Sequence, residues 1–287
     1  KGAPIPLPEG YTWDDISYVI GGYKWKSRYM DKDGFIITKA GDKPGKNQYN
    51  FQTGTWSDYH PGEEKKYDCG NCHTTGYSKE GSQGGLKGIV GTWQFAGISC
   101  EACHGPGGDH VAKGGEKAAI KVDRGAALCG QCHVRGASDK IPASGGFIRH
   151  HEQYNEHLAS PHGKLGCVSC HDPHKRAELS IKRDCGACHP KQKAAFTGSK
   201  MEKVGLKCDD CHMPKATKSA VKIAKYEADV KTHLLRINID AGASMFTEDG
   251  KFAKNFVTLD FACLNCHKDR DVKWAAGLAK GAHSLGK

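Results

Sequence analysis

Every cysteine of this 287-residue chain belongs to one recurring pattern, Cys-x-x-Cys followed directly by histidine. The chain has 14 cysteines, so the pattern occurs seven times. The seven copies are CGNCH (69–73), CEACH (100–104), CGQCH (129–133), CVSCH (167–171), CGACH (185–189), CDDCH (208–212) and CLNCH (263–267). This fixed spacing constrains the fold more than any other feature of the sequence.

Cys-x-x-Cys-His is the attachment sequence of c-type haem. The two thiols add across the vinyl groups of the porphyrin, and the adjacent imidazole reaches the iron from one face. Zinc knuckles also use Cys-x-x-Cys pairs, but a closed zinc site needs four ligands and gives no reason for histidine at one fixed offset. Disulfides in a secreted protein would not require that histidine either. The sequence therefore predicts seven covalent haem c (heme c) groups.

The predicted site residues follow from the motifs, and no catalytic residue is predicted. The haem-attachment residues are Cys69, Cys72, Cys100, Cys103, Cys129, Cys132, Cys167, Cys170, Cys185, Cys188, Cys208, Cys211, Cys263 and Cys266. The proximal iron ligands are His73, His104, His133, His171, His189, His212 and His267.

The second axial position of each iron separates an electron carrier from a catalyst, because catalysis needs an open or weakly held site. Seven of the 16 histidines are proximal, so nine remain. These distal candidates are His60, His110, His150, His151, His157, His162, His174, His233 and His283. Methionine is the usual alternative, but there are only four, and Met213 directly follows proximal His212. We expect mainly bis-histidine coordination and low potentials.

Local context ranks the candidates. It favours His110, His162, His174 and His233. Adjacent His150 and His151 project to opposite sides of a helix or strand, so we expect only one of them to bind iron. His174 lies three residues after proximal His171, too near to circle the same porphyrin, and should serve a different haem.

The composition agrees with a cofactor-filled interior. Only 38% of the residues are hydrophobic and 8% aromatic, so the side chains alone would make a thin core. The 37 glycines suggest that backbone passes close to something bulky that is not protein. Porphyrins would supply the buried apolar area that folding requires.

The formal net charge of +10 does not indicate nucleic acid as a partner, because the 42 Lys and Arg residues form no basic run or aromatic-interleaved stripe. Seven haems would add roughly 14 propionates and turn the sum into about −4. There is no apolar run of membrane-spanning length and no signal-peptide pattern, and the chain starts at Lys1. We expect an exported protein, extracellular or at the cell surface, alternatively periplasmic.

The predicted fold class is a multihaem cytochrome c, mostly irregular with short helices around a stack of covalent haems. Residues 1–62 are expected to form a haem-free, β-containing cap that begins with an extended arm at 1–9, and residues 63–287 one continuous heptahaem region. A β-hairpin is predicted over 18–38, because Tyr23, Trp25 and Tyr29 alternate with basic residues before a turn at 31–34. Further strands are predicted at 49–53 and 232–238, and helices at 147–160 and 271–285.

Residues 69–189 resemble multihaem c-type cytochromes related to the tetrahaem electron acceptor of hydroxylamine oxidoreductase. The resemblance rests on CEACHGPGGDH (100–110), on SPHG before CVSCHDPH (160–174) and on RHHEQYNE (149–156). That group includes periplasmic carriers and extracellular cytochromes that polymerise into conducting filaments. The haem count, the β-containing N-terminus and the long interval between residues 212 and 263 depart from the tetrahaem pattern.

The predicted function is electron transfer along seven closely packed haems, without enzymatic activity. The expected partners are other redox proteins and further copies of this chain in a filament, in which one subunit could donate an iron ligand to the next. The alternative is a haem reductase or oxidase of a small nitrogen or sulfur compound, which would need one open iron. None of the seven motifs has its histidine replaced, as such enzymes often show.

Residues 150–189 hold two motifs and five further histidines. The first three motifs have only His60 and His110 as spare imidazoles in their own region, so some of His150, His151, His157 and His162 are expected to reach back to them. Replacing His162 or His174 with alanine should then convert one haem to the high-spin form. An unchanged low-spin spectrum in both variants would contradict this expectation.

Overall fold

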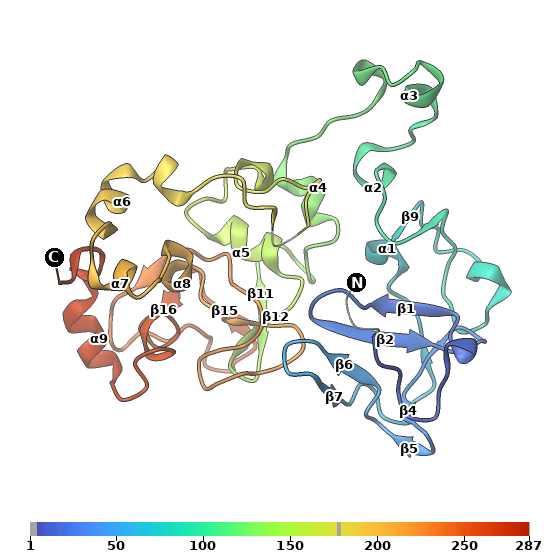
Figure 1. The fold of residues 1–287 in the computed structure, drawn as a ribbon, viewed down its shortest axis with the longest axis horizontal. Helices are drawn as coiled ribbons and strands as arrows, with labels where there is room; N and C mark the ends of the chain where they lie inside the picture. The colour runs from blue at the N-terminus through green and yellow to red at the C-terminus, as the bar shows by residue number, and fades with distance from the viewer. Residues whose placement is uncertain (1–4, 177–178, 287) are drawn as a thin grey trace. The chain divides into compact units, whose positions relative to one another are not determined.

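The computed structural model describes residues 5–176 and 179–286. The chain divides into two compact units, Lys1–Asp123 and Arg124–Lys287 (Figure 1). This boundary follows the second motif, whereas the sequence predicts a cap at 1–62 and one continuous heptahaem region at 63–287. Residues of the expected cap and the first two motifs thus share one compact unit, which we call unit 1; the remainder is unit 2.

Unit 1 is built on a six-stranded antiparallel sheet in the order β7-β6-β2-β3-β8, with β1 also paired to β2. Its strands are β1 (Tyr18–Gly21), β2 (Lys26–Met30), β3 (Phe35–Ile36), β6 (Gln48–Asn50), β7 (Thr55–Ser57) and β8 (Lys65–Lys66). Two smaller pairs are β4 (Lys39–Ala40) with β5 (Lys43–Pro44) and β9 (Thr74–Thr75) with β10 (Phe95–Ala96).

The predicted hairpin is confirmed in β2 and β3. Met30 pairs with Ile36, and Gly34 takes a φ of 85°, a left-handed value that favours glycine. Residues 23–25 precede β2 instead of starting it, and β1 adds a third strand. The strand predicted at 49–53 forms at Gln48–Asn50. Residues 5–8 of the predicted arm are irregular, and the arm's first four residues lie outside the described part of the chain.

The sheet of unit 1 packs directly against the first motif. Its buried core consists of Met30, Ile36, Tyr67, Ile89 and Trp93, and Cys69 packs against this cluster. The β-rich residues therefore anchor the first Cys-x-x-Cys-His turn. The remaining short elements are η1 (Trp13–Asp15), α1 (Gly70–His73), η2 (Gln83–Gly85), α2 (Glu101–His104), α3 (Gly108–Ala112) and η3 (Lys117–Ala119).

Unit 2 has a four-stranded sheet in the order β13-β12-β11-β15 and a parallel pair, β14 with β16. The strands are β11 (Ile141–Ser144), β12 (Phe147–Arg149), β13 (Thr217–Lys218), β14 (Ile237–Asn238), β15 (Phe252–Ala253) and β16 (Val257–Thr258). The helical elements are α4 (Ala126–Gly130), α5 (Gln153–Ala159), η4 (Cys167–Ser169), η6 (Cys185–Ala187), α6 (Pro190–Phe196), α7 (Lys200–Lys203), α8 (Cys208–His212), η7 (Asp260–Leu264), α9 (Val272–Ala279) and η8 (Ala282–Ser284).

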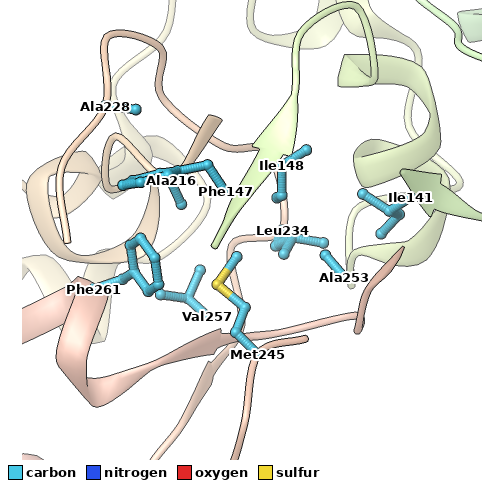
Figure 2. Packing of buried hydrophobic residues seen from close by; sticks show 10 residues of the cluster. All are labelled: Ile141, Phe147, Ile148, Ala216, Ala228, Leu234, Met245, Ala253, Val257 and Phe261. Atoms are coloured by element: carbon cyan, nitrogen blue, oxygen red, sulfur yellow. The ribbon is translucent and has the colours of Figure 1, made fainter. Parts of the chain in front are cut away.

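The core of unit 2 is a cluster of buried apolar side chains from segments far apart in the sequence (Figure 2). Phe147 stands edge-on to Phe261, with 5.8 Å between the ring centroids. Ile148 and Leu234 are fully buried in the same cluster. This core joins β12 to residues beyond the sixth motif.

The helix predicted at 147–160 is wrong in its first part. Phe147 and Ile148 belong to strand β12, where Ile148 pairs with Ala143 on one side and Thr217 on the other. The helix α5 begins only at Gln153. Burial between two strands outweighed the local helical pattern, because sheet pairing depends on partners that are remote in sequence.

Two other predicted elements form over shorter stretches. Only Ile237–Asn238 of the strand expected at 232–238 is paired. The C-terminal helix predicted at 271–285 forms as α9, where Asp271 accepts a hydrogen bond from the Trp274 N–H at 2.8 Å, and it gives way to η8. Among the described residues, no helix is both long and apolar enough to cross a membrane.

Candidate haem sites

Each Cys-x-x-Cys-His motif forms a single helical turn. In six motifs the histidine N–H donates to the carbonyl of the first cysteine, at 2.9–3.2 Å, as in His104 to Cys100 at 2.9 Å. The sixth motif lies within α8. Side chains three and four residues apart share one helix face, so both thiols and the imidazole point to the same side. This is the arrangement that a porphyrin edge and its iron require.

The thiols remain accessible on these turns. All fourteen cysteines lie among the described residues, and each is exposed or half-buried. Burial within the protein therefore does not prevent the sulfur atoms from bonding to a porphyrin.

Glycines inside the motifs make room for neighbouring tyrosine rings. A Cβ added at Gly130 would lie 2.7 Å from the ring of Tyr154, and one at Gly70 would lie 2.5 Å from the ring of Tyr77. At these positions the close neighbour of the glycine is a protein side chain. The composition had suggested that glycines accommodate a bulky cofactor, and this explanation does not apply to Gly70 and Gly130.

Several proximal histidines are oriented through Nδ1. His104 donates to the Lys121 carbonyl at 2.6 Å, and His212 donates to the Leu235 carbonyl at 2.8 Å. His171 contacts the Ser180 hydroxyl at 3.2 Å and His133 the Gln153 side-chain oxygen at 3.3 Å. Such contacts leave Nε2 for a metal and fix the ring orientation. These partners lie 9 to 23 residues from the histidines, so no local sequence pattern marked them.

Three proximal histidines face a spare histidine at a similar separation. The ring centroids are 6.2 Å apart for His171 and His233, 5.7 Å for His189 and His162, and 5.9 Å for His212 and His283. Two imidazoles that bind one metal from opposite sides, with metal–nitrogen bonds of about 2 Å and ring radii of about 1.1 Å, have centroids about 6 Å apart. The observed separations fit one iron between each pair.

The spare members of these pairs are kept neutral. Burial, followed by neighbouring imidazoles, lowers the pKa of His162 and His283 and lowers that of His233 to about 4. A neutral imidazole is the form that ligates metal. The Nδ1 atoms of His162 and His233 are buried without a hydrogen-bond partner, which marks both rings as unsatisfied by protein alone.

The second motif borders a cavity of about 660 Å³, lined by Cys100, His104, His110, Val111 and Ile120 among others. Its size falls within the roughly 300–1,000 Å³ of ligand and cofactor pockets. Val111, an apolar side chain of this lining, is 76% exposed. His110 is held by Nδ1 against the Glu116 carbonyl at 2.8 Å, as expected of a metal-ligating histidine. The residues present here fit a haem.

The other distal candidates have different surroundings. His157 donates from Nε2 to the Leu165 carbonyl at 2.8 Å, so this nitrogen is occupied. His60 contacts the Glu63 carboxylate through Nδ1 at 2.7 Å. The side chain of His174 is 77% exposed, and its Nδ1 lies 3.5 Å from Asp172. His162 lies beside the fifth motif instead of reaching back to the first three.

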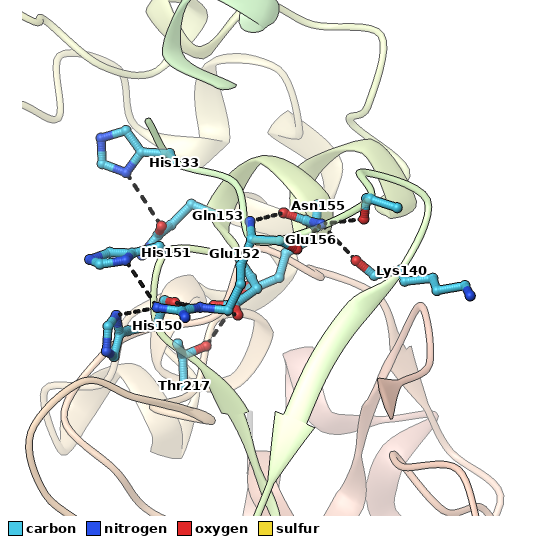
Figure 3. A network of polar contacts seen from close by, with 11 residues as sticks. His133, Lys140, His150, His151, Glu152, Gln153, Asn155, Glu156 and Thr217 are labelled. Atoms are coloured by element: carbon cyan, nitrogen blue, oxygen red, sulfur yellow. Dashed lines mark hydrogen bonds and ion pairs between the residues drawn. The ribbon is translucent and has the colours of Figure 1, made fainter. Parts of the chain in front are cut away.

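His150 and His151 meet at Arg135, two residues beyond the third motif (Figure 3). The guanidinium lies 3.5 Å from Nδ1 of His150 and 3.3 Å from Nδ1 of His151. It can only donate, so in this arrangement both Nδ1 atoms accept. Iron binding through Nε2 of either ring therefore requires Arg135 to turn away.

Strained backbone coincides with candidate ligand positions. Four non-glycine residues among those described have positive φ, and they include His60 at 49°, His151 at 77° and Leu235 at 61°. Such conformations persist only where the surrounding structure imposes them, and they cluster at functional sites. His60 and His151 are candidate ligands, and Leu235 is the acceptor for His212.

The last five motifs adjoin one another in sequence order. The thiols of Cys129 and Cys167 share a hydrogen bond that lowers the pKa of Cys167 to about 7. Burial is the largest cause that raises the pKa of the Cys185 thiol. The nearby thiols of Cys208 and Cys170 raise it further. Burial, and after it the nearby thiol of Cys263, raises the pKa of the Cys211 thiol to about 11. Motifs three to seven therefore form an unbroken run within unit 2.

The fold and the motif turns resemble those of multihaem c-type cytochromes, and the expected resemblance is confirmed. Residues 39–105 match the family described as cytochrome c554 and c-prime. Multihaem cytochrome MtrA of Shewanella baltica (strain OS185) is 29% identical over 138 residues, which cover 42% of this chain and 36% of that protein.

Two solved structures share the fold. The octahaem sulfite reductase MccA of Wolinella succinogenes matches 90% of this chain and 57% of its own, with a TM-score of 0.62 and 17% identity. The outer cell wall cytochrome OcwA matches 93% of this chain and 75% of its own, with a TM-score of 0.58 and 18% identity. The chain thus spans only part of the length of its relatives. Haem c is the cofactor that these likenesses support.

Replacing Gly130 with alanine should destabilise the haem-loaded protein, because the new Cβ would collide with the Tyr154 ring. Overpacking of this kind costs about 1–3 kcal/mol. Thermal unfolding followed by circular dichroism would measure the loss. Gly277→Ala is the matched control, since nothing lies within 4 Å of that position in α9, and alanine favours a helix by up to about 1 kcal/mol. Equal melting temperatures for the two variants would contradict the packing role of Gly130.

Proposed function

We propose that this chain transfers electrons through seven covalently bound haem c groups with mainly bis-histidine coordination. The observation that carries the proposal is the run of adjacent motifs three to seven in unit 2, together with the histidine pairs beside three of them. Neighbouring attachment turns bring porphyrins close together, which electron transfer between them requires.

The proposed axial pairs are His171 with His233 at the fourth motif, His189 with His162 at the fifth, and His212 with His283 at the sixth. His110 is proposed as a distal ligand through its free Nε2, at a haem other than that of His104, which is only six residues away. His60, His150, His151 and His174 stay candidates for the remaining positions.

Haem c, when bound at these sites, would supply reversible one-electron redox chemistry at its iron. The paired histidines of the chain would hold the iron of such a haem, so that neither substrate nor water would need to exchange. Hydrogen bonds at Nδ1, such as that of His104 to Lys121, fix the imidazoles and make them more basic, which favours low potentials. The same histidines would hold the iron in both oxidation states.

A haem reductase is the second candidate function. The fold likeness to the octahaem sulfite reductase MccA favours it. A reductase needs one iron with an open position, whereas the intact motifs and the histidine pairs favour closed sites. Electron paramagnetic resonance distinguishes them, because an open site gives a high-spin ferric signal and a wholly low-spin spectrum opposes catalysis.

We further propose that the protein acts outside the cytoplasm and associates with redox proteins and with other copies of itself in a filament. The fold likeness to the outer cell wall cytochrome OcwA supports an exported location. Negative-stain imaging and gel filtration of the haem-loaded protein should show polymers. Monomers alone at all concentrations would contradict self-assembly without affecting the electron-transfer proposal.

Haem content and redox behaviour test the main proposal. We expect a pyridine haemochrome assay to give seven haems per chain and spectropotentiometry to show reversible uptake of seven electrons, because each motif attaches one iron. Zinc in the purified protein, or fewer than seven haems per intact chain, would contradict the count.

Replacing His162 with alanine should convert one haem equivalent to the high-spin form, because its ring faces His189 at 5.7 Å. The ferric absorption and paramagnetic resonance spectra would report the change. His157→Ala is the matched control from the same region, since its Nε2 is already bonded to Leu165, and it should leave every haem low-spin. Identical spectra for the two variants would refute the assignment of His162.

A further inference from the structure

Residues 231–235, which we call the bridge segment, contact two different motifs of unit 2. His233 faces proximal His171 of the fourth motif, and the Leu235 carbonyl accepts from proximal His212 of the sixth. Between them, Leu234 is fully buried in the hydrophobic core. A single residue thus separates a candidate distal ligand of one site from the hydrogen-bond acceptor of another.

The His233 end is held by Glu156 on α5, which is fully buried. Its carboxylate accepts from the Thr232 hydroxyl at 2.7 Å and also from the backbone N–H of His233. From outside the bridge segment, the Thr217 hydroxyl of β13 donates to the same carboxylate at 3.0 Å (Figure 3). Hydrogen bonds to a carboxylate are stronger than neutral ones, so they fix the backbone that carries the His233 ring.

The sixth motif contacts both ends of the bridge segment, at Lys231 and at Leu235. Lys231 forms ion pairs with Asp209 at 2.6 Å and Asp210 at 2.8 Å, the two residues between the cysteines of that motif. Leu235 adopts a φ of 61°, which is unfavourable for leucine and directs its carbonyl to Nδ1 of His212. Because Leu234 is fixed in the core, the segment has little freedom to absorb a displacement of His233 before it reaches Leu235.

We propose that the bridge segment couples the fourth and sixth haem sites, so that a shift at His233 changes the hydrogen bond on His212 and with it the potential of the sixth haem. Thr232 and Leu235 are positioning residues in this coupling. A weaker bond to Leu235 makes the His212 imidazole less basic, which stabilises ferric iron less and raises the potential. The inference deepens the proposed function and rests on its axial pairs.

The test first marks the sixth haem by giving it a distinct potential. It then perturbs the bridge segment at Thr232, away from Leu235. His283→Met in the haem-loaded protein should raise the potential of the sixth haem above the others, because methionine ligation favours ferrous iron. Thr232→Val is then added, which removes a hydroxyl donor to Glu156 without changing charge or shape. Thr217→Val is the matched control, since it removes a donor to the same carboxylate from outside the bridge segment.

Spectropotentiometry should show the marked haem moving to a still more positive potential with Thr232→Val and staying in place with Thr217→Val. A marked haem that stays in place with Thr232→Val, or moves equally with both variants, would overturn the coupling. If Thr232→Val does not fold, Leu235→Gly tests the segment from its other end, because glycine accepts the positive φ but frees the carbonyl. That variant should move two haem equivalents, and movement of one alone would also overturn the coupling.

The unmodified protein tests the proposed function separately. Its haems should be low-spin and reversibly reduced whether or not the fourth and sixth sites are coupled. If His283→Met yields no haem of raised potential, the pairing of His212 with His283 is wrong and the coupling inference falls with it.

Discussion

The hydrogen bond from the motif histidine N–H to the carbonyl of the first cysteine, found in six motifs, is the interaction on which the rest of the structure depends. It closes one helical turn and sets two thiols and an imidazole on one face. Long helices are not needed for this, because one turn suffices. The rest of the chain positions these turns and brings second histidines toward them.

The side-chain core is correspondingly modest and serves the same end. In unit 1, Cys69 packs on the sheet core, so the β-rich residues hold the first attachment turn. In unit 2, Leu234 is buried between His233 and Leu235, which contact two different motifs. Buried apolar groups thus fix the segments that carry candidate iron ligands, and haem c would add the apolar area that the composition lacks.

Local signals predicted local structure well and remote pairing poorly. The turn at residues 31–34 and the cap of α9 at Asp271 depend on neighbours in sequence, and both hairpin and helix are present. The local pattern around Ile148 predicts a helix, but Ile148 lies in β12, because its partners Ala143 and Thr217 decide its conformation. The acceptors of the proximal histidines, such as Leu235, were missed for the same reason.

The sequence by itself determined the attachment chemistry, because Cys-x-x-Cys-His within one helical turn needs no tertiary contact to present its ligands. It also supplied a surplus of nine further histidines without saying which faces which motif. Only the tertiary structure decided that His162 lies against His189 and His233 against His171, while His157 bonds to Leu165. Those pairings depend on how distant segments pack around a buried core, which spacing along the chain does not encode.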